Sequence, residues 1–220
     1  MGKKNSDIET HSFPNKGELH IWKAFSCNKK KERNLIGYNK ECSISSSSTN
    51  GYFTPSRRIV VQIAASYLCL DPKYISLGIN DGGKPHIENQ DRLHFNLSHC
   101  GDDVVVVFSR DPVGFDMERK DRKSDFIRVA RRFFNVSEAD EIEKHGEDLF
   151  LQRWTAKEAM LKLEGSGLRG GLANAEVVSP GYGRVIGRRV FLKELDWPLH
   201  YAHVASLKRI VVMREFEFKE

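Results

Sequence analysis

A strand-like stretch interrupted by one turn constrains the fold of this chain more than any other feature. Residues 104–108 form an apolar run rich in valine, residues 109–112 carry the polar and proline signals of a turn, and residues 113–118 resume the apolar pattern. Side chains of a strand point alternately to its two faces. The pattern therefore predicts a sheet strand with one apolar face and with two acids, Asp116 and Glu118, together on the other.

Asp116 and Glu118 stand roughly 6–7 Å apart along such a strand, at about 3.3 Å per residue. At that separation a divalent cation, which prefers carboxylate oxygens, can draw the two side chains together. Two acids on a solvated sheet edge have the same spacing, so the pattern alone leaves both interpretations open.

A second segment, about forty residues further along the chain, has the periodicity of a helix. Its apolar residues fall on one stripe: Phe150, Leu151, Trp154 and Leu161. Glu158 lies inside this stripe, where an ionised carboxylate is costly unless it is paired or coordinated. Lys157 and Lys162 flank the stripe, one on each side. A surface ion pair between Glu158 and Lys162, worth roughly 0.2–0.5 kcal/mol, explains Lys162 but not the position of Glu158.

The composition is that of a globular protein with a basic balance. Of the 220 residues, 40% are hydrophobic and 30% are charged, with a formal net charge of +5 and a pI near 9.0. Such a charge suits a polyanionic partner, whether nucleic acid, an acidic protein surface or a multiply phosphorylated small molecule. No apolar run has the ~18–20 residues of a membrane span, and the N-terminus lacks the apolar core of a secretory signal. Four cysteines without C-x-x-C spacing fit a reducing compartment. We therefore expect a cytoplasmic protein with no membrane contact.

The periodicity of the whole chain predicts an α+β fold. Residues 1–17 have the composition of a polar tail, residues 18–110 form an N-terminal half and residues 111–220 a C-terminal half. Each half carries helical and strand-like stretches, and Ser124 and Ser137 are the expected N-caps of two helices. Strands are expected in the C-terminal half near residues 175–178, 185–192, 200–206 and 210–218.

Taken in order, these segments resemble the signature of the 4′-phosphopantetheinyl transferases. Six stretches are similar to elements of that family: G-K-P at 83–85, F-N-L-S-H at 95–99, V-G-F-D-M-E at 113–118, F-F-N-V-S-E at 133–138, W-T-A-K-E-A-M-L-K at 154–162 and G-S-G-L at 165–168. The resemblance covers roughly residues 57–170. The length resembles that of the longer, single-chain type, which activates surfactin synthetase and other synthetases of secondary metabolism.

The resemblance implies both a fold and a reaction. The fold would consist of two similar α/β halves packed as a pseudo-dimer, so that a monomer holds the site between them. The reaction would transfer the 4′-phosphopantetheine arm of coenzyme A to a serine of an apo acyl carrier or peptidyl carrier protein. Adenosine 3′,5′-bisphosphate would be released.

By the same resemblance, three acids hold the metal and two lysines hold the phosphates. Asp116, Glu118 and Glu158 would bind Mg²⁺, with Mn²⁺ as the alternative ion. Glu158 is also the candidate base that takes the serine proton. Lys157 and Lys162 would hold pyrophosphate oxygens, and Lys162 would offset the charge that develops in the transition state.

The remaining similar positions imply contacts with coenzyme A. Lys84, Pro85 and His86 resemble the segment that lines the adenine. Ser98 and His99 resemble the pair that contacts the ribose 3′-phosphate.

Arg57, at the head of a helix predicted at 56–70, is a further candidate phosphate contact, although an ordinary surface arginine fits it equally well. Two departures from the family pattern weaken this side of the site. Val61 stands where many relatives carry a second arginine, and residues 29–53 lack the family's E-x-x-R-x-x-R-F run. Residues 29–33 are basic instead, and residues 45–51 are rich in serine.

Two other classes of protein remain as alternatives. A nucleic-acid-binding module would explain the high pI and would bind in a steeply salt-dependent way without any need for Asp116. No recognition-helix, zinc-finger or RNA-binding pattern supports it, so we expect no nucleic-acid partner. A metal-dependent phosphodiesterase or nuclease would use the same acids to hydrolyse coenzyme A or nucleotides without a carrier protein.

Overall fold

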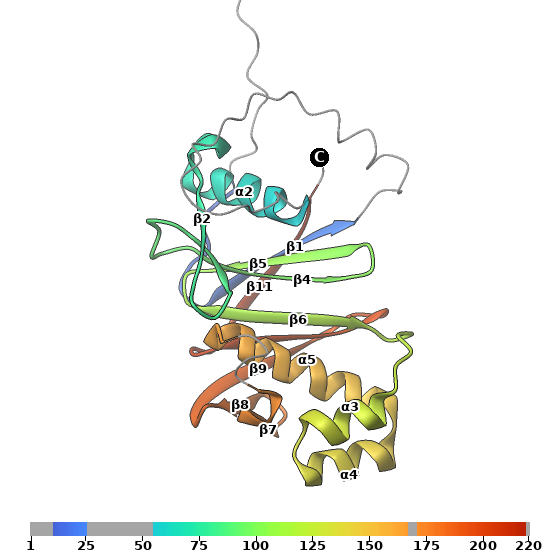
Figure 1. Cartoon of the computed structure of the whole chain (residues 1–220). Helices are drawn as coiled ribbons and strands as arrows, with labels where there is room; N and C mark the ends of the chain where they lie inside the picture. Colours follow the sequence, from blue (N-terminus) through green and yellow to red (C-terminus); the bar gives the residue numbers. More distant parts are fainter. Residues whose placement is uncertain (1–10, 26–54, 167–170, 219–220) are drawn as a thin grey trace, which may run out of the picture.

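Two β-sheets, each with a helix on its outer face, make up the computed structural model of the chain (Figure 1). The structure describes residues 11–25, 55–166 and 171–218. The basic run at 29–33 and the serine-rich loop at 45–51, which the sequence singled out, lie outside these residues. The mixture of helices and sheets confirms the α+β class.

The first sheet contains four strands in the order β11–β1–β5–β4. They are β1 (Glu18–Phe25), β4 (His94–Cys100), β5 (Asp103–Ser109) and β11 (Val212–Glu217). The valine run of the sequence forms β5, which pairs antiparallel with both β1 and β4. β11 runs parallel to β1 at the far edge. The run is apolar throughout because β5 lies inside the sheet and is buried on both faces.

Helix α2 (Pro55–Leu68) covers the outer face of this sheet, where its apolar side packs against β1, β4 and β5. The hydroxyl of Tyr67 fastens the helix to β1. It lies 2.6 Å from Nδ1 of His20 and accepts a hydrogen bond of 2.7 Å from Nε1 of Trp22. A short 3₁₀ helix, η1 (Pro72–Tyr74), then leads to a small hairpin of β2 (Leu77–Ile79) and β3 (Pro85–Ile87).

The second sheet contains five antiparallel strands in the order β6–β10–β9–β8–β7. They are β6 (Val113–Arg119), β7 (Ala175–Ser179), β8 (Tyr182–Val185), β9 (Arg188–Asp196) and β10 (His200–Ser206). The strand expected near 185–192 is β9, which begins at Arg188 rather than at residue 185. A turn at Ile186 and Gly187, both with positive φ (48° and 74°), splits that stretch into the ends of β8 and β9.

Three helices and a 3₁₀ turn accompany the second sheet: α3 (Phe126–Phe133), α4 (Val136–His145), α5 (Glu147–Glu164) and η3 (Leu172–Asn174). The expected caps Ser124 and Ser137 are wrong, because Asp125 caps α3 and Asn135 caps α4. Asn135 accepts from the backbone N–H of Glu138, whose side chain accepts in return from the N–H of Asn135. This reciprocal pair starts α4 two residues earlier than a cap at Ser137 would.

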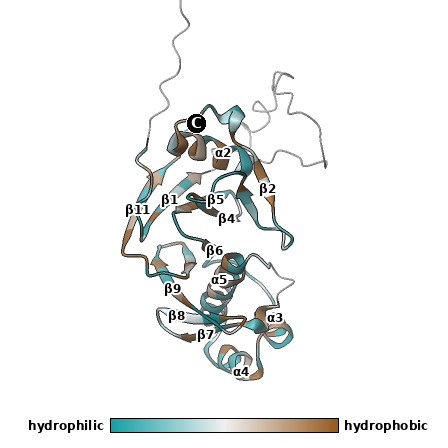
Figure 2. Ribbon diagram, turned by 90° about the vertical axis from the view of Figure 1, so that its left-hand side faces the viewer, coloured by the Kyte–Doolittle hydropathy of each residue, from teal (hydrophilic) through white to brown (hydrophobic). Residues whose placement is uncertain are grey.

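An apolar core joins the inner faces of the two sheets, so the layers run α2, first sheet, second sheet, α5. Side chains of β1 and β5 meet there with those of β6, β9 and β10. A second core lies between α5 and the second sheet. Figure 2 shows the layers from the side, with α2 above the first sheet and α5 beside the second. That the two halves resemble each other stays a prediction.

The course of the chain crosses between the layers near its end. After β10 in the second sheet, the chain returns to the first sheet and adds β11 beside β1. Residues 212–217 thus belong to the first sheet, although the division predicted from the sequence grouped all of 111–220 together. Within the described residues, no helix is both long and apolar enough to cross a membrane.

Candidate active site

Strand β6 carries its two acids on the face that the alternation predicted. Its apolar side chains lie in the core between the sheets: Val113, Phe115 and Met117. Asp116 and Glu118 point to the opposite face, toward α5. Asp116 is only 6% exposed, which excludes the interpretation of a solvated edge for this residue.

Helix α5 lies so close to β6 that only glycine fits at position 114. A Cβ atom there would stand 2.0 Å from the carbonyl oxygen of Ala159 and 2.4 Å from the backbone nitrogen of Leu163. Both are backbone atoms, so no side-chain movement could make room. Gly114 therefore sets the height of the helix above the strand, and with it the distance of the side chains of α5 from the acids.

Three of the predicted side chains meet between α5 and β6. Lys162 donates a hydrogen bond of 2.7 Å to Oδ1 of Asp116. Burial raises the pKa of Glu158 to about 7, and the charge of nearby Asp116 adds to the effect while Lys162 opposes it. The sequence therefore identified correctly that Glu158 lies on a side of the helix where its charge is poorly solvated.

The carboxylates in this site fit a divalent cation. Oδ2 of Asp116 and Oε1 of Glu158 are both buried without a hydrogen-bond partner, a costly state for anionic oxygens. Oxygen ligands from two or three carboxylates are the donor set that Mg²⁺ and Mn²⁺ prefer. In the described part of the chain, no group of three such side chains is already arranged to hold a metal. The third acid, Glu118, would have to turn toward the other two.

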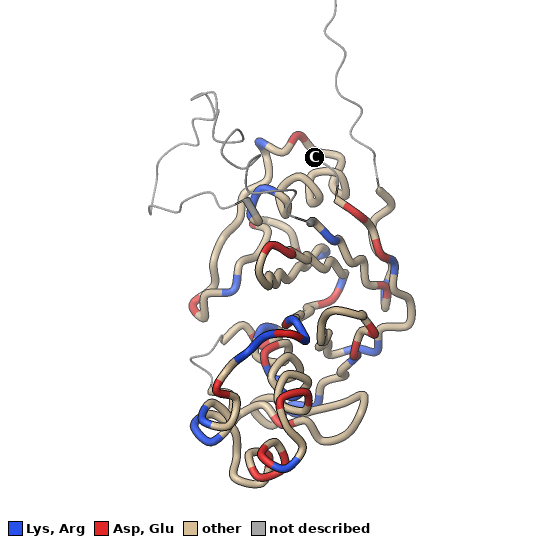
Figure 3. Tube along the Cα trace, turned by 90° about the vertical axis from the view of Figure 1, so that its right-hand side faces the viewer, with Lys and Arg blue, Asp and Glu red and all other residues tan. Residues whose placement is uncertain are grey.

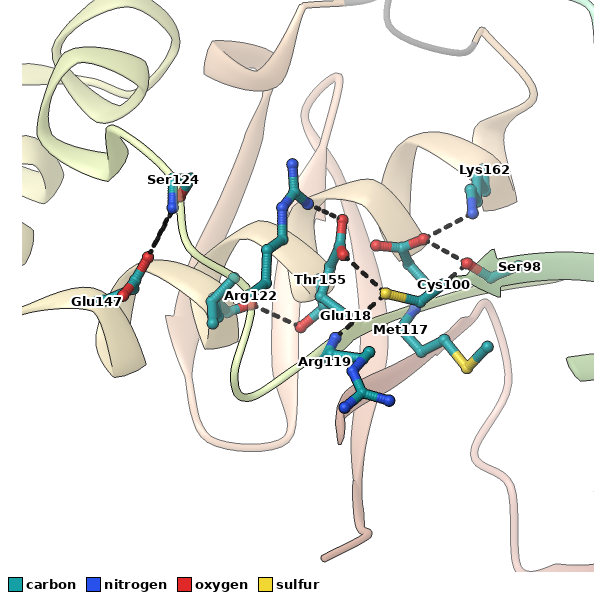
Figure 4. A network of polar contacts seen from close by, with 12 residues as sticks. Ser98, Cys100, Met117, Glu118, Arg119, Arg122, Ser124, Glu147, Thr155 and Lys162 are labelled. Atoms are coloured by element: carbon teal, nitrogen blue, oxygen red, sulfur yellow. Dashed lines mark hydrogen bonds and ion pairs between the residues drawn. The ribbon is translucent and has the colours of Figure 1, made fainter. Parts of the chain in front are cut away.

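Glu118 instead contacts two residues that the sequence did not single out as ligands of the site (Figure 4). Arg122 forms an ion pair with Oε1 of Glu118, and the Sγ of Cys100 lies 3.4 Å from its Oε2. The i,i+4 spacing of Glu118 and Arg122 was the available signal for the first contact. The second depends on how two sheets pack, and no local pattern reports it.

Side chains of β4 contact the backbone of β6 across the boundary between the sheets. Asn96 Oδ1 accepts from the N–H of Phe115 at 2.8 Å, and Ser98 Oγ from the N–H of Met117 at 3.4 Å. The hydroxyl of Ser98, which is 5% exposed, also hydrogen-bonds Oδ1 of Asp116 at 2.8 Å. Ser98 thus lies beside the acids of β6.

The structure does not bring Lys157 to this site, contrary to the expectation that it holds pyrophosphate. Its side chain is fully buried on the other side of α5. Its ammonium donates to Oε2 of Glu138 at 2.6 Å and to the carbonyl oxygens of Ala175 and Leu172 at 2.6 and 3.3 Å. With three acceptors and no solvent access, it has no donor left for a phosphate. The burial lowers its pKa, against the opposing effect of Glu138.

Lys84 joins the hairpin of β2 and β3 to α5 and β6. Its ammonium donates to the carbonyl oxygens of Val113 at 2.9 Å and of Leu163 at 3.3 Å. Burial lowers its pKa to about 8. The turn before it packs closely on the end of α5, because a Cβ at Gly82 would stand 1.7 Å from the carbonyl oxygen of Gly165.

The other predicted coenzyme A contacts lie on the side of the first sheet that faces α2. His99 is exposed and shares its strand face with Phe95 and Leu97, which pack against α2. Arg57 lies, half-buried, in the first turn of α2. On β3, His86 is exposed and Pro85 is half-buried.

The charge of the described residues is dispersed. Figure 3 shows Lys and Arg (blue) and Asp and Glu (red) intermingled along the trace. Many pair with one another, as Arg131 does with Asp140 and Glu143, and Lys23 with Glu215. The net positive charge of the chain does not therefore mark out a nucleic-acid site in this part of the structure.

Comparison with known proteins agrees with the geometry. Residues 112–213 match the model of the 4′-phosphopantetheinyl transferase superfamily. The chain is similar to a 4′-phosphopantetheinyl transferase from Bacillus subtilis, with 38% identity over 109 residues, 48% of each chain. It is 34% identical over 103 residues to the transferase Sfp of Bacillus subtilis, 45% of each chain.

A third relative, HetI of Nostoc sp., is 31% identical over 125 residues, 53% of this chain and 52% of that protein. The matches span about half the length of these curated relatives. The matched family region includes the strand with Asp116 and Glu118 and the helix with Glu158 and Lys162. Through residues 112–213, slightly less than half of its length, the chain is similar to the 4′-phosphopantetheinyl transferase superfamily.

Proposed function

We propose that this protein transfers the 4′-phosphopantetheine arm of coenzyme A to a serine of an apo acyl carrier or peptidyl carrier protein. The observation that supports this most is the pair of buried carboxylate oxygens without partners, on Asp116 and Glu158, next to the ammonium of Lys162. Acids and a cation so arranged suit the transfer of a phosphoryl group from a pyrophosphate. The relatives reported above are named 4′-phosphopantetheinyl transferases.

In this proposal, Asp116, Glu118 and Glu158 hold Mg²⁺ or Mn²⁺. The cation would neutralise negative charge on the pyrophosphate of coenzyme A. To complete this set of ligands, Glu118 would have to give up its ion pair with Arg122. Lys162 turns from Asp116 to the pyrophosphate, where it offsets the charge that the leaving oxygen gains.

The bond changes follow from the two substrates. The serine oxygen forms a bond to the phosphorus that carries the pantetheine arm, and the bond from that phosphorus to the bridging oxygen breaks. Adenosine 3′,5′-bisphosphate leaves with the electron pair. Glu158 takes the serine proton in this proposal.

The first sheet supplies the coenzyme A contacts in this proposal. His99 and Arg57 are the proposed ligands of the 3′-phosphate, and the β3 segment with Pro85 and His86 lies along the adenine. Lys84 contributes by holding this segment against α5. The role of Lys157 in this proposal is only structural. One chain carries all of these groups, so the protein would act as a monomer, in the cytoplasm.

Intact-mass spectrometry of an apo carrier protein tests the proposal. Incubation with coenzyme A and Mg²⁺ should add about 340 Da, one phosphopantetheine arm, and EDTA should abolish the gain. Asp116→Ala and Glu158→Gln should fold normally and lose the transfer. Glu164→Gln should retain the transfer. Glu164 is the last residue of the same helix, and it pairs with Arg188 instead of the acids. Retained transfer in Asp116→Ala would contradict the metal assignment.

The same assay distinguishes the proposed transfer from hydrolysis of coenzyme A. Coenzyme A that is cleaved while the carrier protein stays unmodified would establish a phosphodiesterase in place of a transferase. None of the relatives reported above is named as a nuclease or a nucleic-acid-binding protein.

A further inference from the structure

Strands β4 and β6 are each the last strand of their own sheet, and no backbone ladder joins them. Three N–H groups at alternate residues of β6 nevertheless find acceptors on β4. The acceptors are side-chain atoms: Oδ1 of Asn96 for Phe115, Oγ of Ser98 for Met117 and Sγ of Cys100 for Arg119, at 2.8, 3.4 and 3.4 Å. Such a ladder satisfies buried N–H groups that an edge strand would otherwise leave without partners.

The register of this ladder also brings side chains of β4 into contact with the two acids of β6. Each of these three side chains of β4 accepts from the N–H of the residue nineteen positions further along the chain. Two of them also contact the carboxylate of the residue eighteen positions further along. These are Ser98 on Asp116 at 2.8 Å and Cys100 on Glu118 at 3.4 Å. Ser98 and Cys100 therefore contact the acids from the first sheet, whereas the acids belong to the second.

At Asp116 this contact determines how the carboxylate is turned. Ser98 and Lys162 both donate to Oδ1, at 2.8 and 2.7 Å. Two donors on one oxygen restrict rotation of the carboxylate and leave Oδ2 as the oxygen without a partner. Lys162 has a further task in the proposed transfer and must be free to move. The hydroxyl of Ser98 is held from both sides, by the N–H of Met117 and by Asp116.

We propose that Ser98 is a positioning residue of the metal site, holding Asp116 so that Oδ2 is presented to the cation. This inference rests on the proposed function. It replaces the contact between Ser98 and the 3′-phosphate that the family resemblance implies. A hydroxyl carries one proton, and that of Ser98 is on Asp116. Cys100 contacts Glu118 as Ser98 contacts Asp116, but a thiol is a weaker donor than a hydroxyl. The weaker contact agrees with the orientation of Glu118, which is turned toward Arg122 and away from the other two acids.

The affinity for Mn²⁺ tests the inference. It is measured in the presence of coenzyme A from the decrease in the electron paramagnetic resonance signal of the free ion. Ser98→Ala should weaken Mn²⁺ binding by about 10-fold or more, the usual effect of removing a group that orients a metal ligand. Ser98→Cys, which has nearly the same shape and a weaker donor, should fall between the wild type and Ser98→Ala. Ser206→Ala is the matched control. Ser206 is equally buried, at 5%, and its hydroxyl bonds only the carbonyl oxygen of Lys208.

A second measurement separates positioning from phosphate binding. Transfer rates are compared with coenzyme A and with 3′-dephospho-coenzyme A as donors. A positioning role predicts that Ser98→Ala lowers kcat by the same factor with both donors. A contact with the 3′-phosphate predicts a raised KM with coenzyme A that disappears with the dephospho donor.

The outcomes are distinct. Unchanged Mn²⁺ binding in Ser98→Ala, or a defect seen only with coenzyme A, would overturn the inference and leave the proposed function intact. A wild-type protein that binds no Mn²⁺ would overturn both. Should Ser98→Ala fail to fold, shown by its thermal transition, Ser98→Cys decides the question, because wild-type affinity in that variant would equally refute a role for the donor.

Discussion

At the scale of single residues, Glu158 combines burial with two acidic neighbours, Asp116 and Glu118. Its pKa of about 7 in the folded protein lies above the ordinary 4.5. The folded chain therefore keeps a proton that the unfolded chain releases as the pH rises from 4.5 to 7. Metal-free protein should lose stability across that window, because the folded state binds more protons than the unfolded one.

Glu158→Gln removes this penalty, because glutamine does not ionise. In EDTA at pH 8, the variant should be more stable than the wild type, on the order of 1–2 kcal/mol after allowance for solvent screening. At pH 4 the difference should vanish. Thermal unfolding at the two pH values measures it, with Glu164→Gln as the control. Mg²⁺ added at pH 8 should stabilise the wild type and not the variant. An equal difference at both pH values would contradict the raised pKa.

His99 offers a second test at this scale. It is exposed on the α2 side of β4, whereas Ser98 beside it is buried against Asp116. His99→Ala should raise the KM for coenzyme A several-fold and change the KM for 3′-dephospho-coenzyme A much less, because only the former has the phosphate. Steady-state kinetics with the two donors measures this. His86→Ala, exposed on β3, should not discriminate between the donors. Equal effects of His99→Ala on both would remove its assignment to the phosphate.

The surroundings of the two lysines of α5 could not be predicted from the sequence. The helical wheel placed Lys157 and Lys162 correctly on opposite flanks of the stripe, but it carries no information on what faces each flank. Lys162 meets Asp116 of β6, and Lys157 meets Glu138 of α4 and carbonyl groups near η3. Only the packing of α4 and β6 on opposite sides of α5 decides which ammonium lies beside Asp116.

At the scale of elements, the contact between α5 and β6 through Gly114 is the most exacting. Gly114→Ala would force the helix from the strand, since the new Cβ would meet backbone atoms at 2.0 and 2.4 Å. We expect a loss of about 1–3 kcal/mol or more together with a loss of transfer, because Glu158 and Lys162 would move from Asp116. Urea unfolding and the carrier-protein assay measure the two effects.

A matched glycine controls for backbone strain. Gly187 has φ +74° and no atom within 4 Å of a new Cβ. Gly187→Ala should therefore cost only about 1–2 kcal/mol of left-handed strain and keep full activity per folded molecule. A Gly114→Ala protein as stable and as active as the wild type would show that the helix can move freely over the strand.

Elements with strong local patterns were predictable. The alternation in β6 and the helical stripe of α5 are short-range patterns, and the structure confirms both the strand and the helix. The caps at Ser124 and Ser137 were wrong because several hydrogen-bonding side chains compete at each helix start. Asn135 wins at α4 because Glu138 can return its hydrogen bond.

At the scale of the whole molecule, the first sheet depends on residues from the far end of the chain. Arg214 of β11 forms an ion pair with buried Glu18 of β1, and Phe216 stacks on Trp22 with the ring centroids 4.7 Å apart. Nothing local in residues 212–217 indicates a parallel partner so distant in sequence. For this reason the α+β class and the strand with the two acids could be predicted from the sequence, whereas the assignment of strands to sheets required the structure.

Removal of residues 212–220 should destabilise both sheets, because the uncovered edge of β1 also borders the shared core. We expect the melting temperature to fall by roughly 10 °C or more, with a broader transition. Circular dichroism follows it. Met213→Ala, which changes an exposed side chain in the same strand, should unfold like the wild type. A truncated protein with an unchanged transition would mean that β11 adds nothing to the sheet.

The parallel pairing of β1 with β11 also bears on how the protein is made. At about 5–20 residues per second, the ribosome delivers β11 on the order of ten seconds or more after β1. Until then β1 has one free edge, and the buried acid Glu18 lacks its arginine partner. The first sheet thus stays incomplete while all the residues between β1 and β11 are synthesised. β1 must wait for a strand made much later before its second edge is paired.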